Sequence, residues 1–149
     1  MTITSAPILT IRGLRVALPE GGDRAFALNG LDLTIRPGEI VCMVGESGSG
    51  KSLSAGAIMR LLPEPHVRVA GGQITFEGED ILAKSEAQMR QIRGNRISMI
   101  FQEPMTALNP QKTIGWQIDE VLKLHMNAPR AARRAHALQM LERVQIPDP

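Results

Sequence analysis

The sequence has little of several features that define common protein classes. It contains one cysteine, no tyrosine, one tryptophan and three phenylalanines among 149 residues. A single cysteine excludes an internal disulfide framework and a Cys-rich zinc site. No apolar run approaches the ~20 residues that span a bilayer, and the first residues lack the pattern of a secretory signal. The net charge of +2 is too small to indicate nucleic-acid binding. We therefore expect a soluble, cytoplasmic protein that does not bind nucleic acid.

The first third of the chain carries two different β patterns. Residues Ile8–Arg12 and Leu31–Ile35 alternate apolar and polar side chains, as half-buried strands do, and the turn-rich segment Pro19–Asp23 lies between them. Residues Ile40–Val44 are continuously apolar, which is typical of a strand buried on both faces in a helix-covered parallel sheet. Cys42 lies within this run, so we interpret it as an inert core thiol. An α/β core is predicted to begin here.

Helices and strands are predicted to alternate through the rest of the chain. The expected elements are a helix over 51–62 ended by Pro63, a strand over 72–76, a helix begun by the capping box Ser85–Gln88, a second apolar strand over 97–101, and two helices with apolar faces within 114–125 and 131–144. The arginines near the start of the last helix are interpreted as a solvated face, and contact with acidic phospholipid or a membrane-protein loop is the alternative.

One motif carries a specific chemistry. The run Gly45-Glu46-Ser47-Gly48-Ser49-Gly50-Lys51-Ser52 fits G-x-x-x-x-G-K-[ST] between a predicted strand and a predicted helix. Such glycines let successive backbone N–H groups converge on β- and γ-phosphates, and the helix N-terminus favours an anion there. Lys51 is predicted to reach the phosphate oxygens, and Ser52 is predicted to ligate Mg²⁺. The sequence therefore predicts a nucleotide-phosphate site.

A second candidate residue, Gln102, follows the second predicted apolar strand. Ligands of parallel sheets bind beyond the carboxyl ends of the strands, where both Gly45 and Gln102 are expected. An amide at this edge can approach Mg²⁺ and the γ-phosphate. On spacing alone, an ordinary polar residue at a strand end is the alternative.

Together, the motif Gly45–Ser52 and the run Met99-Ile100-Phe101-Gln102-Glu103-Pro104-Met105-Thr106-Ala107-Leu108-Asn109-Pro110 resemble the ATP-binding subunit of an ABC transporter. The second run narrows the resemblance to the oligopeptide/dipeptide importer branch, which includes nickel, glutathione and microcin-type peptide importers. The resemblance implies that Gly45–Ser52 is the Walker A motif and that Gln102 is the Q-loop glutamine. Lys51 and Gln102 would then contribute to catalysis, and Ser52 and Gln102 would hold Mg²⁺.

The resemblance also implies a domain plan for the chain. Residues 1–149 would be the N-terminal part of one α/β P-loop ATPase domain of the ABC type. An antiparallel β region over 1–38 would precede a P-loop core over 39–103 with a β/helix insertion near 71–94, and 104–149 would begin a helical subdomain. The domain would be incomplete.

The function implied by the resemblance is ATP binding and hydrolysis that drives import of peptides or a related small solute. The implied partners are ATP, integral-membrane permease subunits, a second identical or different ATP-binding subunit and, indirectly, an extracytoplasmic solute-binding protein. The protein would lie peripherally on the cytoplasmic face of the cell membrane. The solute itself is chosen by the binding protein and the permease.

Two departures from the family pattern modify this expectation. Leu18 stands where such subunits usually carry an aromatic residue that stacks on adenine, so it would cover less of the base. The signature L-S-G-G-Q, the Walker B strand and the switch histidine do not occur in the 149 residues. Ala70–Gln73 and Ile118–Glu120 resemble fragments of these motifs, but we interpret the first as part of a strand and the second as a solvated helix face.

We therefore predict that the 149 residues alone do not turn over ATP. We also expect exposed apolar edges beside the two apolar strands, with a tendency to aggregate. A stand-alone nucleotide-binding module and a non-functional remnant are the alternatives to an incomplete transport ATPase.

Overall fold

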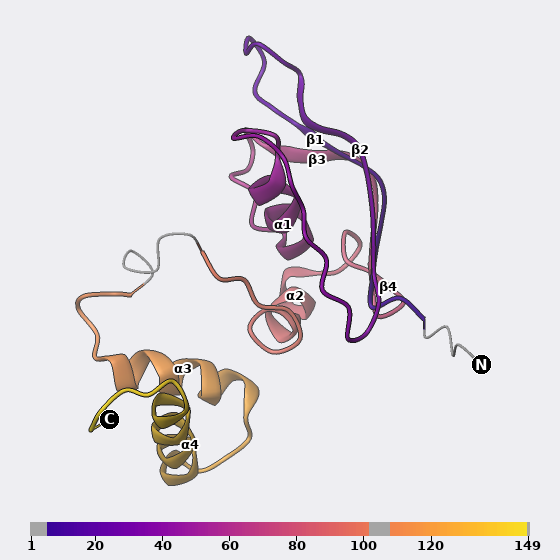
Figure 1. Ribbon diagram of the computed structural model, residues 1–149. Coiled ribbons are helices and arrows are strands. Elements are labelled where there is room, and N and C mark those ends of the chain that lie inside the picture. Colours follow the sequence, from indigo (N-terminus) through magenta and orange to yellow (C-terminus); the bar gives the residue numbers. More distant parts are fainter. Residues whose placement is uncertain (1–5, 102–107, 149) are drawn as a thin grey trace. The chain divides into compact units, whose positions relative to one another are not determined.

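The computed structural model describes residues 6–101 and 108–148, which form two compact units that meet in sequence between Met89 and Arg90 (Figure 1). The elements are β1 (Leu9–Ala17), β2 (Phe26–Ile35), α1 (Lys51–Met59), β3 (Arg68–Phe76), β4 (Glu79–Asp80), α2 (Glu86–Ile92), α3 (Ile114–His125) and α4 (Arg130–Arg143). No helix within the described ranges is long and apolar enough to cross a membrane.

An antiparallel sheet with the strand order β2-β1-β3-β4 dominates the first unit. Leu9 on the central strand β1 pairs with Ile35 on one side and with Phe76 on the other. The predicted strands over Ile8–Arg12 and Leu31–Ile35 are confirmed within longer strands. The hairpin connection brings β2 beside β1, so each of these strands finds a partner close in sequence.

The core of the first unit lies where α1 packs against β2 and β3. The buried side chains of β1 alternate on either side of an irregularity between Ile11 and Leu14, where the pairing register shifts. The buried apolar residues of this unit are Leu9, Ile11, Leu14, Val16, Ala27, Leu28, Ala57, Met59, Ile74, Phe76, Ile81 and Met89. The sheet therefore supplies a firm support for α1 and for the segment that precedes it.

The two continuously apolar segments are not strands, so that prediction is wrong for the structure described. Residues 40–44 have no regular secondary structure, and residues 97–101 contribute only an isolated bridge between Arg93 and Ile97. Ile40 is 98% exposed and Ile100 is 95% exposed. An extended segment becomes a strand only when neighbours pair with its backbone, and among residues 6–101 and 108–148 neither run has such neighbours.

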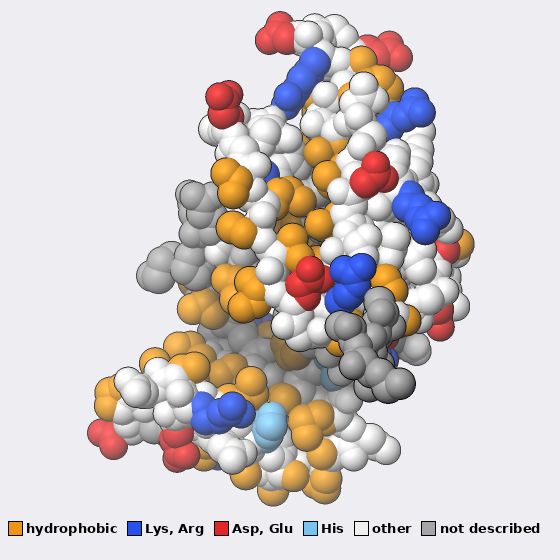
Figure 2. All heavy atoms as spheres, turned by 45° about the vertical axis from the view of Figure 1, so that its right-hand side comes forward, with side chains coloured by type: hydrophobic (Ala, Val, Ile, Leu, Met, Phe, Trp, Pro, Cys, Tyr) orange, Lys and Arg blue, Asp and Glu red, His pale blue; other side chains and the backbone are white. Residues whose placement is uncertain are grey.

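Side chains of the two apolar segments are exposed because no neighbouring strand among the described residues covers them. Cys42 is exposed and is not the core thiol that was predicted. Strand edges are not present at these segments, but their large apolar side chains are exposed, and Figure 2 shows many hydrophobic side chains at the surface of the face drawn there.

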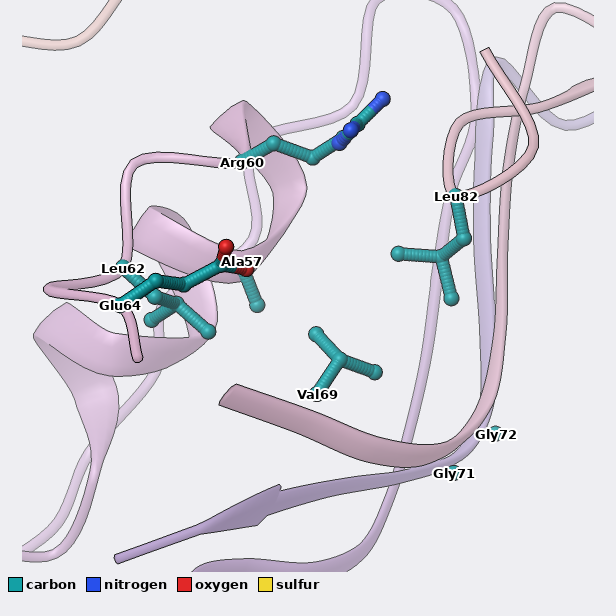
Figure 3. Close-up of a pocket in the computed structure, with 8 residues that line it drawn as sticks. All are labelled: Ala57, Arg60, Leu62, Glu64, Val69, Gly71, Gly72 and Leu82. Atoms are coloured by element: carbon teal, nitrogen blue, oxygen red, sulfur yellow. The ribbon is translucent and has the colours of Figure 1, made fainter. Parts of the chain in front are cut away.

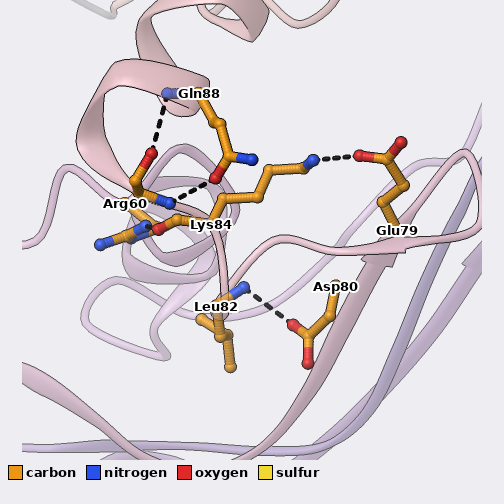
Figure 4. A network of polar contacts seen from close by, with 7 residues as sticks. Arg60, Glu79, Asp80, Leu82, Lys84 and Gln88 are labelled. Atoms are coloured by element: carbon orange, nitrogen blue, oxygen red, sulfur yellow. Dashed lines mark hydrogen bonds and ion pairs between the residues drawn. The ribbon is translucent and has the colours of Figure 1, made fainter.

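The predicted capping box at the start of α2 is confirmed. The backbone N–H of Ser85 donates to Gln88 Oε1 at 2.7 Å, and the N–H of Gln88 donates to Ser85 Oγ at 3.3 Å. Adjacent polar contacts join this start to the rest of the unit, because Arg60 donates to the Lys84 carbonyl and Lys84 pairs with Glu79 (Figure 4). A strong local signal was therefore sufficient to place this helix end.

The second unit packs α3 against α4. The Thr113 side chain caps α3 by accepting from the N–H of Trp116 at 3.2 Å. Asp119 on α3 accepts from Arg133 on α4 at 2.7 Å from Nε and 3.3 Å from Nη2. This bidentate contact lowers the pKa of Asp119 and raises that of Arg133.

The structure tests the interpretation of the two fragments that resemble family motifs, Ala70–Gln73 and Ile118–Glu120. Asp119 lies on a helix, as predicted, and so is not the end of a Walker B strand. However, it forms a partly buried ion pair with Arg133, so the expected fully solvated face is wrong for these two residues. Residues 70–73 lie inside β3, which agrees with the interpretation that they enter a strand.

Candidate functional site

The glycine-rich segment ends where α1 begins, and Gly50 makes this junction possible. Gly50 is the N-cap of α1 and has a left-handed backbone with φ of 93°. A Cβ at this position would lie 2.6 Å from Leu28 Cδ2 and 2.9 Å from the Ala27 carbonyl oxygen. Only glycine fits both the conformation and the space. The start of β2 therefore fixes where the loop enters the helix.

The N-terminus of α1 is suited to an anion. Gly50 has no side chain to cap the helix, and the described first turn contains no acidic residue. Residues 45–49 are exposed and lead directly to this end. The first backbone N–H groups of a helix have no partner inside the helix, and the helix dipole is positive there. Phosphate oxygens are suitable acceptors for such N–H groups.

Lys51 points back over the loop that precedes it. Its Nζ donates to the carbonyl oxygens of Gly45 and Glu46, both at 2.7 Å, and to Ser49 Oγ at 3.2 Å. The structure therefore brings Gly45, Glu46, Ser49 and Lys51 together. The predicted role of Lys51, contact with phosphate oxygens, stays a prediction.

Ser54 anchors the first turn of α1 and was not identified from the sequence. Its side chain is 2% exposed, and its Oγ donates to the Lys51 carbonyl oxygen at 2.6 Å. Ser54 Oγ also lies 3.5 Å from Met43 Sδ. The available signal was a small polar residue three positions after the lysine, a spacing at which a hydroxyl bonds back to the helix backbone.

The remaining predicted site residues have different outcomes. Ser52 is exposed on the first turn of α1, next to Lys51, and its role as an Mg²⁺ ligand stays a prediction. Gln102 lies outside the described residues. Leu18 is partly exposed just after β1, and its N–H donates to the Ala25 carbonyl oxygen at 2.9 Å.

The hairpin that carries Leu18 contacts the phosphate loop through another residue. Arg24 Nη2 donates to the Gly48 carbonyl oxygen at 2.6 Å. The sequence gives no sign of this contact, because Arg24 only follows the turn-rich segment Pro19–Asp23 and its partner lies 24 residues away.

Other features of the described chain lie apart from this loop. A cavity of about 350 Å³ next to α1 and β3 is lined by Ala57, Arg60, Leu62, Glu64, Val69, Gly71, Gly72 and Leu82 (Figure 3). None of these residues belongs to the segment 45–52, so the cavity is not part of the site. Within residues 6–101 and 108–148, no group of three His, Cys, Asp or Glu side chains could hold a metal ion.

A glycine-rich loop that closes on a helix N-terminus and holds a lysine over its own carbonyls defines a P-loop nucleotide-binding protein. Residues 28–149 match the ABC transporter family, and the chain belongs to that family.

The chain is similar to curated peptide transport proteins. It is 51% identical over 142 residues to the probable D,D-dipeptide transport ATP-binding protein DdpD of Escherichia coli (strain K12), covering 95% of this chain and 43% of that protein. It is 42% identical over 142 residues to the oligopeptide transport ATP-binding protein OppD of Bacillus subtilis (strain 168), covering 95% of this chain and 40% of that one. The chain thus spans less than half the length of these relatives.

A solved structure confirms the fold class. The dimeric post-hydrolysis state of the ATP-binding cassette MJ0796 bound to ADP and Pi matches with a TM-score of 0.78 and 22% identity. The match covers 94% of this chain and 58% of that chain. The antiparallel sheet, the P-loop with α1 and the following helices therefore form part of an ABC ATPase cassette.

Proposed function

We propose that this chain is part of an ATP-binding subunit that couples ATP binding and hydrolysis to the import of peptides or a related small solute. The observation that carries the proposal is the loop 45–50 closed on the N-terminus of α1, with the Lys51 ammonium 2.7 Å from two loop carbonyls. The names of the relatives DdpD and OppD support the peptide class of solute.

The residues of the loop fit a triphosphate. The first-turn N–H groups of α1 and the lysine ammonium supply donors and positive charge, and the first turn of α1 contains no acidic residue. Ser52 and Gln102 would hold Mg²⁺, which neutralises charge on the phosphate oxygens when bound. Leu18 would give the adenine an apolar contact of smaller area than an aromatic ring provides.

The partners follow from the proposed role. Residues 39–103 would form the P-loop core, and 104–149 would begin the helical subdomain that faces membrane permease subunits. A second ATP-binding subunit would complete the nucleotide site, and a solute-binding protein would deliver the solute to the permease. The subunit would work on the cytoplasmic face of the membrane. We further propose that the 149 residues alone bind ATP without turning it over, because no signature or Walker B sequence is present in them.

Calorimetric titration of the chain with Mg-ATP tests this proposal. Lys51→Ala should weaken binding at least about tenfold, since it removes a charge-assisted contact to phosphate. Lys123→Ala removes the same charge from an exposed position on α3 and should leave the affinity unchanged. Equal affinities for the unaltered chain and Lys51→Ala, or no binding by the unaltered chain, would contradict nucleotide binding at this loop. Steady-state hydrolysis that is lost in Lys51→Ala would contradict the proposed lack of turnover.

A further inference from the structure

The loop of the β1–β2 hairpin reaches the phosphate loop through one long side chain. The hairpin loop is closed by the hydrogen bond from the Leu18 N–H to the Ala25 carbonyl at 2.9 Å. Arg24 precedes Ala25 and is exposed, yet its Nη2 donates to the Gly48 carbonyl oxygen at 2.6 Å. An exposed arginine side chain loses rotamer freedom when it is held in one contact. The short contact between the exposed Arg24 and Gly48 therefore indicates that the contact has a function.

The carbonyl that Arg24 holds belongs to a glycine inside the turn that the Ser49 N–H closes on the Glu46 carbonyl. Gly48 has a φ of 77°, and a Cβ placed on it would meet nothing within 4 Å. Side-chain packing therefore does not fix this residue. The Gly48 carbonyl and the Ser49 N–H are parts of one planar peptide group, and the Ser49 N–H donates to the Glu46 carbonyl oxygen at 3.2 Å, so Arg24 and Glu46 hold the two ends of this peptide.

The remaining supports of the loop lie on either side of this peptide. Lys51 holds the Gly45 and Glu46 carbonyls, and Gly50 is packed against Leu28 and Ala27 of β2. The segment 40–44, which leads into the loop, is unpaired. Arg24 is thus the described side chain that connects the middle of the loop to the paired sheet.

We propose that Arg24 is a positioning residue that orients the Gly48–Ser49 peptide of the phosphate loop for phosphate binding. This role rests on the proposed nucleotide binding, and it affects the affinity for the phosphates rather than for the base. Arg24 acts through the Gly48 carbonyl and supplies one donor to it, so another donor of similar reach should replace it in part.

The test compares binding of Mg-ATP and of Mg-tripolyphosphate, which lacks the nucleoside. Arg24→Met should weaken both about fivefold, because it removes one charge-assisted hydrogen bond at an exposed position. Arg24→Lys should restore most of the affinity. The matched control is Arg15→Met on β1, which removes the same charge from another exposed position of the hairpin and should change neither affinity.

Each outcome separates the possible roles. A loss for ATP alone would overturn the inference and assign Arg24 to the base. Unchanged affinities in Arg24→Met would also overturn it, as would a loss that vanishes at high salt, which is the behaviour of a long-range charge effect. If the unaltered chain binds neither ligand, the proposed nucleotide binding itself fails.

A measurement without ligand tests the positioning directly. Amide hydrogen exchange over residues 46–51 should become several-fold faster in Arg24→Met than in Arg15→Met. Equal exchange rates in the two variants would contradict the proposal, whatever the binding data show.

Discussion

Strong apolar strand patterns occur in two parts of this chain, but only one of these parts forms strands. In β1 and β3, Leu14 and Ile74 are both 0% exposed and are paired within the antiparallel sheet. In the segments 40–44 and 97–101, Ile40 and Ile100 are almost fully exposed. The difference lies in the availability of a pairing partner, since the apolar character of the two parts is equally clear.

The comparison shows which kind of sheet a short stretch of sequence can specify. Antiparallel partners such as β1 and β2 can follow one another through a hairpin, whereas parallel partners need a crossover of a dozen or more residues. The described sheet contains antiparallel pairs throughout. A continuous apolar run states only that a segment is suited to burial on both faces. It does not state which part of a protein provides the neighbouring strands.

Replacing one isoleucine in each region by alanine should give the largest difference in the free energy of unfolding. Ile74→Ala should lower the free energy of unfolding by roughly 2–5 kcal/mol, because it leaves a cavity in a packed core. Ile40→Ala should change it by no more than about 0.5 kcal/mol, because the side chain is already in water. Urea denaturation followed by circular dichroism measures both values. A loss for Ile40→Ala as large as that for Ile74→Ala would show that segment 40–44 is buried in solution.

The glycine-rich loop over 45–50 directly follows the unpaired segment 40–44 and depends on the paired strand β2. Gly50→Ala should destabilise the first unit by about 1–3 kcal/mol, because the residue has a positive φ and its Cβ would meet Leu28 and the Ala27 backbone. Gly115→Ala is the matched control, since a Cβ in that helix would meet nothing within 4 Å. It should stabilise the protein by up to about 1 kcal/mol. Thermal unfolding of both variants measures the effects, and equal shifts in Tm would contradict the support of the loop by β2.

Local signals predicted more of this protein than non-local ones. The capping box at Ser85 was predicted correctly, because its partner Gln88 is close in sequence. The alternation of residues 8–12 predicted a strand correctly from the local pattern alone, although Leu9 pairs with Ile35 and Phe76. The motif at 45–52 predicted that Lys51 reaches phosphate oxygens, and this role stays a prediction, while the structure shows its ammonium 2.7 Å from the Gly45 carbonyl. Segment 40–44 was predicted to be a strand but is unpaired, and the contact of Arg24 with Gly48 was not predicted, because neither outcome follows from the residues next to it in sequence.

The ion pair between α3 and α4 differs from the strand pairing discussed above, because opposite charges join two helices. In the second unit, the described buried apolar residues are Leu122 and Ala137, so the Asp119–Arg133 pair contributes beside a small core. Hydrogen bonding to Arg133 lowers the pKa of Asp119 below its ordinary value of 3.8. The folded state therefore binds fewer protons than the unfolded state in acid. The stabilisation is present above that ordinary value and is lost as the pH falls through the lower pKa of the folded protein.

Asp119→Asn should show the smallest of these effects, and the effect should depend on pH. Its Tm should lie below that of the unaltered chain at neutral pH, and the two values should converge as the pH falls below the ordinary pKa of 3.8. The single tryptophan, Trp116, lies on α3, so its fluorescence reports unfolding of this helix pair. Glu120→Gln alters the neighbouring exposed carboxylate and should leave Tm close to that of the unaltered chain throughout this range. A constant difference between Asp119→Asn and the unaltered chain at every pH would show that packing, and not the charge of Asp119, joins the two helices.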